Sequence, residues 1–298
     1  MSNISLIGGG PLALAIGTRL CRSGMNLGCW NRTPAKLASL QRLGGNVAVT
    51  KAELFPHSRL LLICVSDASA VREIFLTPSI PEPAAPALRI VNLSTIGDQA
   101  SGALERELSA AGFAYTDMPV SGGVEGALAG KLAAYVGRAP LGDPLFSQVL
   151  NHLVSAPVYL ADNQMAQAMK VLNNLCEAIN LWGAAEAVAI GQRFGFSIPE
   201  LQRGLTCGRG DSAYLKLLLG RLAKPDEQVA VSLSTRQKDL HLALDLAARL
   251  EADAPVLATV SHLFGQVSHA CGANRDQISC HRWLQEGAGE TPAAPLRA

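Results

Sequence analysis

A short apolar run near the N-terminus ends abruptly in a cluster of glycines. Ile4–Ile7 has the composition of a buried strand, and residues 8–13 follow it as Gly-Gly-Gly-Pro-Leu-Ala. Apolar side chains then recur every four residues from Leu12 to Leu20, which predicts an amphipathic helix. Pro11 suits the first helical turn, where its missing N–H costs nothing. A strand, a tight turn and a helix in this order predict an α/β domain with a doubly wound, mostly parallel sheet.

The glycine cluster matches the dinucleotide-binding pattern G-x-G-x-x-G/A. Gly8 makes the turn, Gly10 lets the backbone approach a pyrophosphate, and Ala13 permits close packing of helix on strand. The pyrophosphate of a dinucleotide sits at such a helix N-terminus. We therefore predict that this turn binds the cofactor through Gly8, Gly10, Pro11, Leu12 and Ala13.

The second predicted strand, Leu27–Trp30, ends in hydrogen-bond donors. In NAD-binding versions of this fold an Asp or Glu here bonds the ribose 2′-hydroxyl. This chain offers amide, hydroxyl and positively charged groups instead, which suit a 2′-phosphate. A solvated helix start would be the alternative reading. We expect NADP(H) to be preferred over NAD(H), with contacts from Asn31, Arg32, Thr33 and Lys36.

Two further apolar runs, at residues 60–65 and 89–93, predict strands that are covered on both faces. Ligands of open α/β sheets bind at the carboxyl ends of the strands. We therefore expect Val65, Ser66 and Thr95 to line the cofactor site, although Ser66 and Thr95 could equally be helix caps. Four prolines between residues 78 and 86 indicate a stiff loop between these strands.

A second glycine-rich stretch, Asp117–Gly123, reads Asp-Met-Pro-Val-Ser-Gly-Gly. Backbone N–H groups of such a loop can all point at one anion, which suits a substrate carboxylate. A glycine-rich loop by itself is more often a plain turn. The fingerprint before it and a lysine-bearing helix after it favour a substrate-binding role for Ser121, Gly122 and Gly123.

Helical periodicity replaces strands from about residue 163 onward. Residues 164–194 predict one long interdomain helix, and Ser234 with Gln237 has the pattern of a capping box at the start of another. Further helices are expected from Pro255 and over residues 276–285, followed by a frayed tail from residue 287. We predict a nucleotide-binding domain over residues 1–162 and an all-α substrate and oligomerisation domain over residues 163–298.

Lys170 and Asn174 lie four residues apart on the long helix and therefore share one face. Such a pair is usually a solvated polar stripe. Opposite a nicotinamide, however, the ammonium could donate a proton to a carbonyl oxygen as hydride arrives. In the reverse direction the neutral amine would accept the hydroxyl proton, and Asn174 would hold the substrate by hydrogen bonds.

Composition indicates which compartment and which classes of partner to expect. The net charge is +1, which gives no reason to expect nucleic acid or an anionic membrane as a partner. Seven scattered cysteines without a CxxC pair indicate reduced thiols and a cytoplasmic protein. His and Cys residues between 269 and 281 match no common zinc spacing, so we expect no metal.

Four segments, taken in order, resemble the β-hydroxyacid dehydrogenase family, which includes 3-hydroxyisobutyrate dehydrogenases and tartronate, glyoxylate and succinic semialdehyde reductases. They are the N-terminal fingerprint, the D-x-P-V-S-G-G loop, the K-x-x-x-N helix from Lys170 and the K-D-L-x-L-A-L helix from Lys238. The resemblance implies a Rossmann domain followed by a helical domain. It also implies NADP-dependent interconversion of a small carboxylated aldehyde or keto acid with its hydroxy acid.

The resemblance also implies the roles of single residues. Lys170 would be the general acid/base with Asn174 assisting, Thr95 would lie near the nicotinamide ribose, and Lys238 would approach the cofactor. The long helix would take part in a homodimer or homotetramer. The family usually has G-x-G-x-x-x-K before the lysine, whereas residues 164–167 here are Gln-Met-Ala-Gln. We expect this difference to affect the substrate pocket more than the reaction type.

Three other functions remain in view. Imine reductases share this scaffold but typically lack both the serine-glycine loop and the lysine. The 6-phosphogluconate dehydrogenases are larger and carry a lysine-histidine-asparagine helix signature that is missing here. A catalytically inactive NADP-binding protein would be expected to lose Lys170, which this chain keeps.

Overall fold

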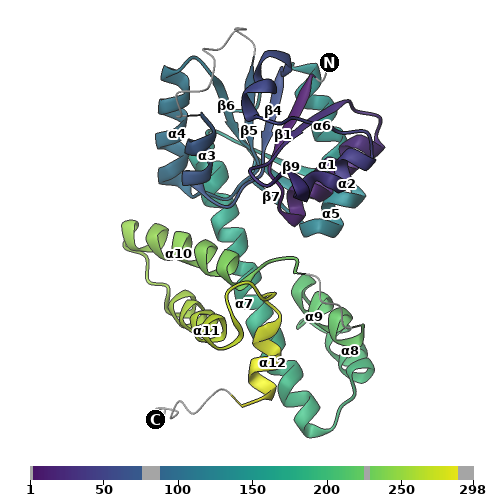
Figure 1. Ribbon diagram of the computed structural model, residues 1–298. Helices are drawn as coiled ribbons and strands as arrows, with labels where there is room; N and C mark the ends of the chain where they lie inside the picture. The colour runs from purple at the N-terminus through teal and green to yellow at the C-terminus, as the bar shows by residue number, and fades with distance from the viewer. Residues whose placement is uncertain (1–2, 76–87, 225–228, 288–298) are drawn as a thin grey trace. The chain divides into compact units, whose positions relative to one another are not determined.

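The computed structural model describes residues 3–75, 88–224 and 229–287 (Figure 1). The chain forms two compact units, Met1–Val171 and Leu172–Ala298, and the division between them falls within one long helix. The domain boundary expected after residue 162 stays a prediction. The predicted proline loop at residues 78–86 and the predicted tail beyond residue 287 lie outside the described residues.

The first unit is built on six parallel strands in the order β3-β2-β1-β4-β5-β6. The order reverses between β1 and β4, as in a doubly wound sheet, which confirms the predicted fold class. β4 and β5 are shorter than predicted, although the backbone ladder continues one residue further: Leu93 N donates to Ile63 O at 2.8 Å. The strands are β1 Ile4–Ile7, β2 Leu27–Trp30, β3 Asn46–Val47, β4 Leu60–Ile63, β5 Arg89–Asn92 and β6 Ala114–Asp117.

Helices cover both faces of this sheet. Figure 1 shows α3 and α4 on one side and α1 and α2 on the other. Successive side chains of β1 therefore enter different cores: Leu6 packs in the core with Ile16, and Ile7 in the core with Phe75. The helices are α1 Pro11–Arg22, α2 Ala38–Arg42, α3 Ala68–Phe75, α4 Asp98–Ala110, α5 Gly123–Ala129 and α6 Pro144–Leu153, with single 3₁₀ turns η1 Pro34–Leu37, η2 Lys51–Glu53 and η3 Phe55–His57.

A smaller sheet follows β6 in the chain, with the order β7-β8-β9. Its strands are β7 Val120–Ser121, β8 Leu132–Gly137 and β9 Val154–Leu160. β7 pairs antiparallel with β8, and β8 pairs parallel with β9. The short β7 holds the predicted substrate loop against this sheet.

Helices are the only regular elements among the described residues of the second unit, apart from one isolated bridge between Ser232 and Asp276. Trp182 on the long helix α7 packs against two other aromatic rings of this unit. The centroid of its ring lies 5.2 Å from that of Phe264 and 6.2 Å from that of Trp283. Across the described ranges no helix has the length and apolar character needed to cross a membrane. The helices are α7 Asn163–Phe194, which begins in the first unit, α8 Ile198–Thr206, α9 Ala213–Ala223, α10 Leu233–Arg249, α11 Pro255–Cys271 and α12 Ser279–Gln285.

Two predicted helix starts are wrong. α10 begins at Leu233, and its cap is Ser232, whose hydroxyl accepts from Thr235 N at 3.2 Å, so the capping box at Ser234 does not form. The last helix begins at Ser279 instead of Asp276. The Asp276 carboxylate accepts from Ala230 N at 2.7 Å and so ties the chain before α10 to the turn before α12. The contact between Ala230 and Asp276 spans 46 positions, so the local pattern could not show it.

A buried polar network joins the sheet to two helices. The Asp117 carboxylate at the end of β6 is fully buried. Its Oδ1 accepts from Asn92 at 2.7 Å, from Tyr115 at 2.8 Å and from Gln167 at 2.8 Å. Its Oδ2 accepts from Ser101 at 2.5 Å. Burial nevertheless raises the pKa of this carboxyl to about 6, against the opposing effect of the four hydrogen bonds.

We expect Asp117→Asn to change the pH dependence of stability. The folded pKa is about 6 against an ordinary value of 3.8, so between these pH values the folded state holds the proton more tightly than the unfolded state. The contribution of Asp117 to the free energy of unfolding therefore falls as pH rises through this window. Relative to Asp117→Asn, the wild-type chain should lose up to about 3 kcal/mol between pH 4 and pH 7. Urea unfolding at several pH values measures this difference, and parallel curves would contradict it.

Candidate active site

Predicted cofactor residues gather along the carboxyl edge of the main sheet, because β2, β1, β4 and β5 are neighbours. At the turn after β1, Gly8 N donates to Trp30 O at 3.0 Å. Gly8 has φ +144°, and a Cβ there would lie 2.1 Å from the carbonyl oxygen of Cys64. Only glycine fits this position, because the turn lies directly against the end of β4.

Gly10 lies in a different environment. It is the N-cap of α1, and a Cβ built on it would meet no protein atom within 4 Å. Packing within the protein therefore does not require glycine here, whereas a ligand approaching the backbone would use the open space. The positive end of the α1 dipole lies at the same point. Pro11, Leu12 and Ala13 complete this first turn, so the residues present fit the pyrophosphate of a dinucleotide.

Of the residues that follow β2, one shapes the turn and the others are exposed to solvent. Asn31 lies against Gly9, and its side chain donates to Thr33 O at 2.9 Å, which shapes the turn. The Arg32 side chain is 87% exposed and forms an exposed ion pair with Glu73 at 3.8 Å. Such a pair contributes little to stability, so the guanidinium can reorient towards a ligand phosphate. Lys36 is also exposed, in the short turn η1.

The segments after β4 and β5 are bonded to each other. Val65 N donates to the Ser94 hydroxyl at 2.9 Å. Ser66 donates to Asp67 at 2.7 Å, and Asp67 in turn accepts from Ala70 N at the start of α3. Ser66 thus supports a helix start while also lying at the strand edge. Thr95, which follows Ser94, is partly buried at the same edge.

The predicted substrate loop has glycines where the backbone requires them. Ser121 ends β7, and Gly122 and Gly123 follow with φ values of +123° and +64°. Residues other than glycine rarely adopt these backbone conformations. The backbone N–H of Asp117, at the start of the loop segment, donates to Asn163 Oδ1 at 2.9 Å. This bond attaches the loop segment to the first residue of α7.

Lys170 and Asn174 both lie on α7 and are both buried, at 6% and 4% exposure. Lys170 falls in the first unit and Asn174 in the second. Asn174 Nδ2 donates to Asp239 Oδ2 at 2.7 Å, and Asp239 also pairs with Lys238 at 2.8 Å. The approach of Asn174 and Lys238 to the cofactor therefore stays a prediction.

Sequence reasoning missed the residues that hold these side chains. Arg236 is buried, and its guanidinium donates to Asn174 O at 2.8 Å and to Glu177 at 3.0 Å. Asp239 orients the Asn174 amide, and Gln167 contacts the backbone on both sides of Thr95. One signal in the sequence could have found them: they are polar residues at helix positions where the apolar periodicity predicts burial.

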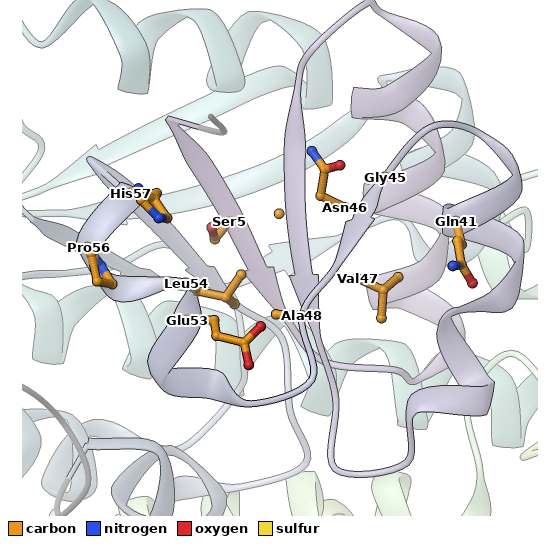
Figure 2. A pocket seen from close by; sticks show the side chains of 11 residues that line it. Ser5, Gln41, Gly45, Asn46, Val47, Ala48, Glu53, Leu54, Pro56 and His57 are labelled. Atoms are coloured by element: carbon orange, nitrogen blue, oxygen red, sulfur yellow. The ribbon is translucent and has the colours of Figure 1, made fainter.

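A hollow of about 750 Å³ opens elsewhere on the first unit, over the face of the sheet beside β3 (Figure 2). Ser5, Asn46, Glu53 and His57 are among its lining residues, and no predicted cofactor or substrate residue lines it. Its Glu53 carboxylate already accepts from Thr50 N at 3.1 Å. In the described part of the chain, no three His, Cys, Asp or Glu side chains cluster as metal ligands would.

Known proteins match both parts of the chain. A family model described as the NAD binding domain of 6-phosphogluconate dehydrogenase matches residues 3–159. A second, described as NAD-binding of NADP-dependent 3-hydroxyisobutyrate dehydrogenase, matches residues 165–284. The 2-hydroxy-3-oxopropionate reductase of Escherichia coli is 28% identical over 91% of this chain and 91% of its own.

Solved structures agree with these matches. Psf3 in complex with NADP+ and 2-OPP is 33% identical with a TM-score of 0.89, over 94% of this chain and 99% of that chain. The 3-hydroxyisobutyrate dehydrogenase of Salmonella typhimurium has the same fold, with a TM-score of 0.86 at 21% identity over 95% of this chain and 99% of that chain. The glycine turn at the strand edge, the lysine helix and these matches together place the chain in the β-hydroxyacid dehydrogenase family, as an oxidoreductase with a pyridine-nucleotide-binding domain.

Proposed function

We propose that this protein is an NADP-dependent oxidoreductase that interconverts a small carboxylated aldehyde or keto acid with the corresponding hydroxy acid, acting on CH–OH donors. The observation that carries the proposal is the burial of Lys170, which is 6% exposed. Lysine side chains are mostly exposed in proteins, so a buried lysine in the K-x-x-x-N segment argues against a solvated polar stripe. Its helix, α7, is also hydrogen-bonded through Gln167 to the strand edge that bears the fingerprint.

In this mechanism NADP(H) supplies or accepts the hydride. The Lys170 ammonium donates a proton to the carbonyl oxygen, and its positive charge stabilises the alkoxide that develops there. In the oxidative direction the neutral Lys170 amine accepts the hydroxyl proton. The backbone N–H groups of Ser121, Gly122 and Gly123 bind the substrate carboxylate. Asn174 holds the substrate without competing for the proton, and no step is assigned to a metal.

Relatives support the cofactor and the substrate class. A relative that is 33% identical was solved with NADP+, and another is named a 2-hydroxy-3-oxopropionate reductase. Imine reduction and an inactive NADP-binding protein are the competing functions. Both are disfavoured because the chain keeps the serine-glycine loop and Lys170 together.

Lys170→Ala should strongly reduce turnover while NADPH binding remains. Loss of a general acid/base lowers kcat roughly 10²- to 10⁴-fold. NADPH oxidation is measured with glyoxylate and with succinic, tartronate and methylmalonate semialdehydes, and NADPH affinity by fluorescence titration. Lys224→Ala, on an exposed lysine of the second unit, is the control. Equal losses of binding and turnover would indicate a structural role for Lys170 and contradict the mechanism.

Arg32→Ala should reduce the preference for NADPH over NADH. A hydrogen bond to a charged group contributes about 1.5–3 kcal/mol, so the ratio of kcat/KM values should fall roughly 10- to 100-fold. Arg22→Ala removes an exposed arginine at the opposite end of α1 and serves as the control. A wild-type enzyme that used both cofactors equally well would refute the proposed role of Arg32.

We further propose that the protein is cytoplasmic, as its scattered cysteines indicate, and that it forms a homodimer or homotetramer, as the resemblance implies. Large apolar side chains near the end of α7 support self-association: Ile190 is 69% exposed and Phe194 is 80% exposed. Isolated apolar side chains on a surface are common, but several on one helix favour an interface. Light scattering coupled to gel filtration should give two or four times 31.2 kDa. The mass of a single chain would exclude the oligomer.

A further inference from the structure

We propose that Gln167 is a positioning residue: it fixes the position of Lys170 relative to residues 94–96, which include Thr95. The inference rests on the proposed role of Lys170 and adds a residue that the family motifs do not mark. Gln167 is fully buried and lies three residues before Lys170 on α7. Residues at this spacing lie on the same side of a helix, one turn apart. A shift of the turn that bears Gln167 would therefore also move Lys170.

The Gln167 amide makes three hydrogen bonds to the strand edge. Its Oε1 accepts from Ile96 N at 2.9 Å. Its Nε2 donates to Ser94 O at 3.0 Å and to Asp117 Oδ1 at 2.8 Å. Both donors of the amide are thus used, and Thr95 lies between the two backbone groups that the amide holds. A single side chain connects the segment predicted to lie near the nicotinamide ribose with the helix that carries the acid/base.

The orientation of this amide follows from the charge of its partner. An ionised Asp117 carboxylate only accepts hydrogen bonds, so it selects the NH₂ end of Gln167. The carbonyl end must then point to Ile96 N. A rotated amide would direct its oxygen at the carboxylate and at Ser94 O, and would leave the Ile96 N–H without its acceptor in a buried site. Such a loss costs about 1–3 kcal/mol for each buried group.

The packing around α7 explains why side chains, and not glycines, occupy this turn. Ala166 is fully buried, whereas the family usually has glycine at this point. The glycine that permits close approach is instead Gly102 on α4, where a Cβ would lie 2.9 Å from the Gln164 amide. With this space provided by α4, the first turn of α7 can carry the long Gln164 side chain.

Gln167→Met tests the inference, because methionine keeps the length of the side chain and removes all three hydrogen bonds. We expect kcat per folded enzyme to fall roughly 10- to 100-fold, as for a small misplacement of a catalytic group. NADPH affinity should stay close to that of the wild type. The isotope effect on kcat with NADPH deuterated at the transferred position should increase, because the chemical step becomes more rate-limiting.

Two controls separate positioning from stability. Gln148→Met is the same substitution at an exposed position on α6 in the same unit, outside every candidate site, and should leave kcat unchanged. Ser5→Ala removes a buried hydrogen bond of 2.6 Å to Ser58 in the same unit, away from the strand edge, and should lower only the melting temperature. Gln167→Asn keeps the amide but shortens its reach, and serves as a second variant if Gln167→Met folds poorly.

The inference fails if Gln167→Met loses no more activity than Ser5→Ala, or if its isotope effect equals that of the wild type. It also fails if neither Gln167 variant folds under conditions in which Ser5→Ala does, because the role would then be structural. A Lys170→Ala variant that retains turnover would refute the proposed function itself. Loss of turnover in Lys170→Ala with normal kinetics in Gln167→Met would refute the positioning role alone.

Discussion

Four hydrogen bonds to the buried Asp117 carboxylate hold the first unit together at its functional edge. A carboxylate without water is tolerated only when its oxygens are well bonded. Asn92, Tyr115, Ser101 and Gln167 provide these bonds from β5, β6, α4 and α7. If any one of these four elements moved, its donor and the Asp117 carboxylate would lose a hydrogen bond in a buried site. The network therefore gives the strand edge, and the helix that carries the proposed acid/base, a defined geometry.

A comparable network organises the second unit. Arg236 is buried and donates to Asn174 O, to Glu177 and to Tyr214, whose hydroxyl donates to Glu177 at 2.7 Å. Asp239, three residues further along α10, accepts from the Asn174 amide. The Asp117 network of the first unit and the Arg236 network of the second unit thus each bond to α7 residues of their own unit. A buried charge whose partner is removed is strongly destabilising, so these clusters define the side-chain conformations in α7 as well as the packing of the helices.

The glycines of the two loops are required for different physical reasons. Gly8 is required by the fold, because any Cβ would collide with the Cys64 carbonyl group. Gly10 is not required by any protein contact within 4 Å, so its backbone is open to the approach of a ligand. Gly122 and Gly123 are required by positive φ values. Glycines that look alike in the sequence are therefore required by packing at Gly8 and by backbone conformation at Gly122 and Gly123.

The sequence alone determined the architecture and most of the candidate site. The fingerprint, the apolar runs and the long helical period are local patterns, and local patterns report turn chemistry and the periodicity of burial. They predicted a doubly wound sheet, a long helix and a helical second half. The family resemblance, and not the local pattern alone, made Lys170 and the serine-glycine loop candidate site residues. Only the tertiary structure decided which polar groups meet. Gln167 bonds partners 50 to 73 positions away, and α10 is capped by Ser232 because residues near 275 occupy the amides beside it. Such contacts depend on how distant elements pack, and no short-range pattern encodes them.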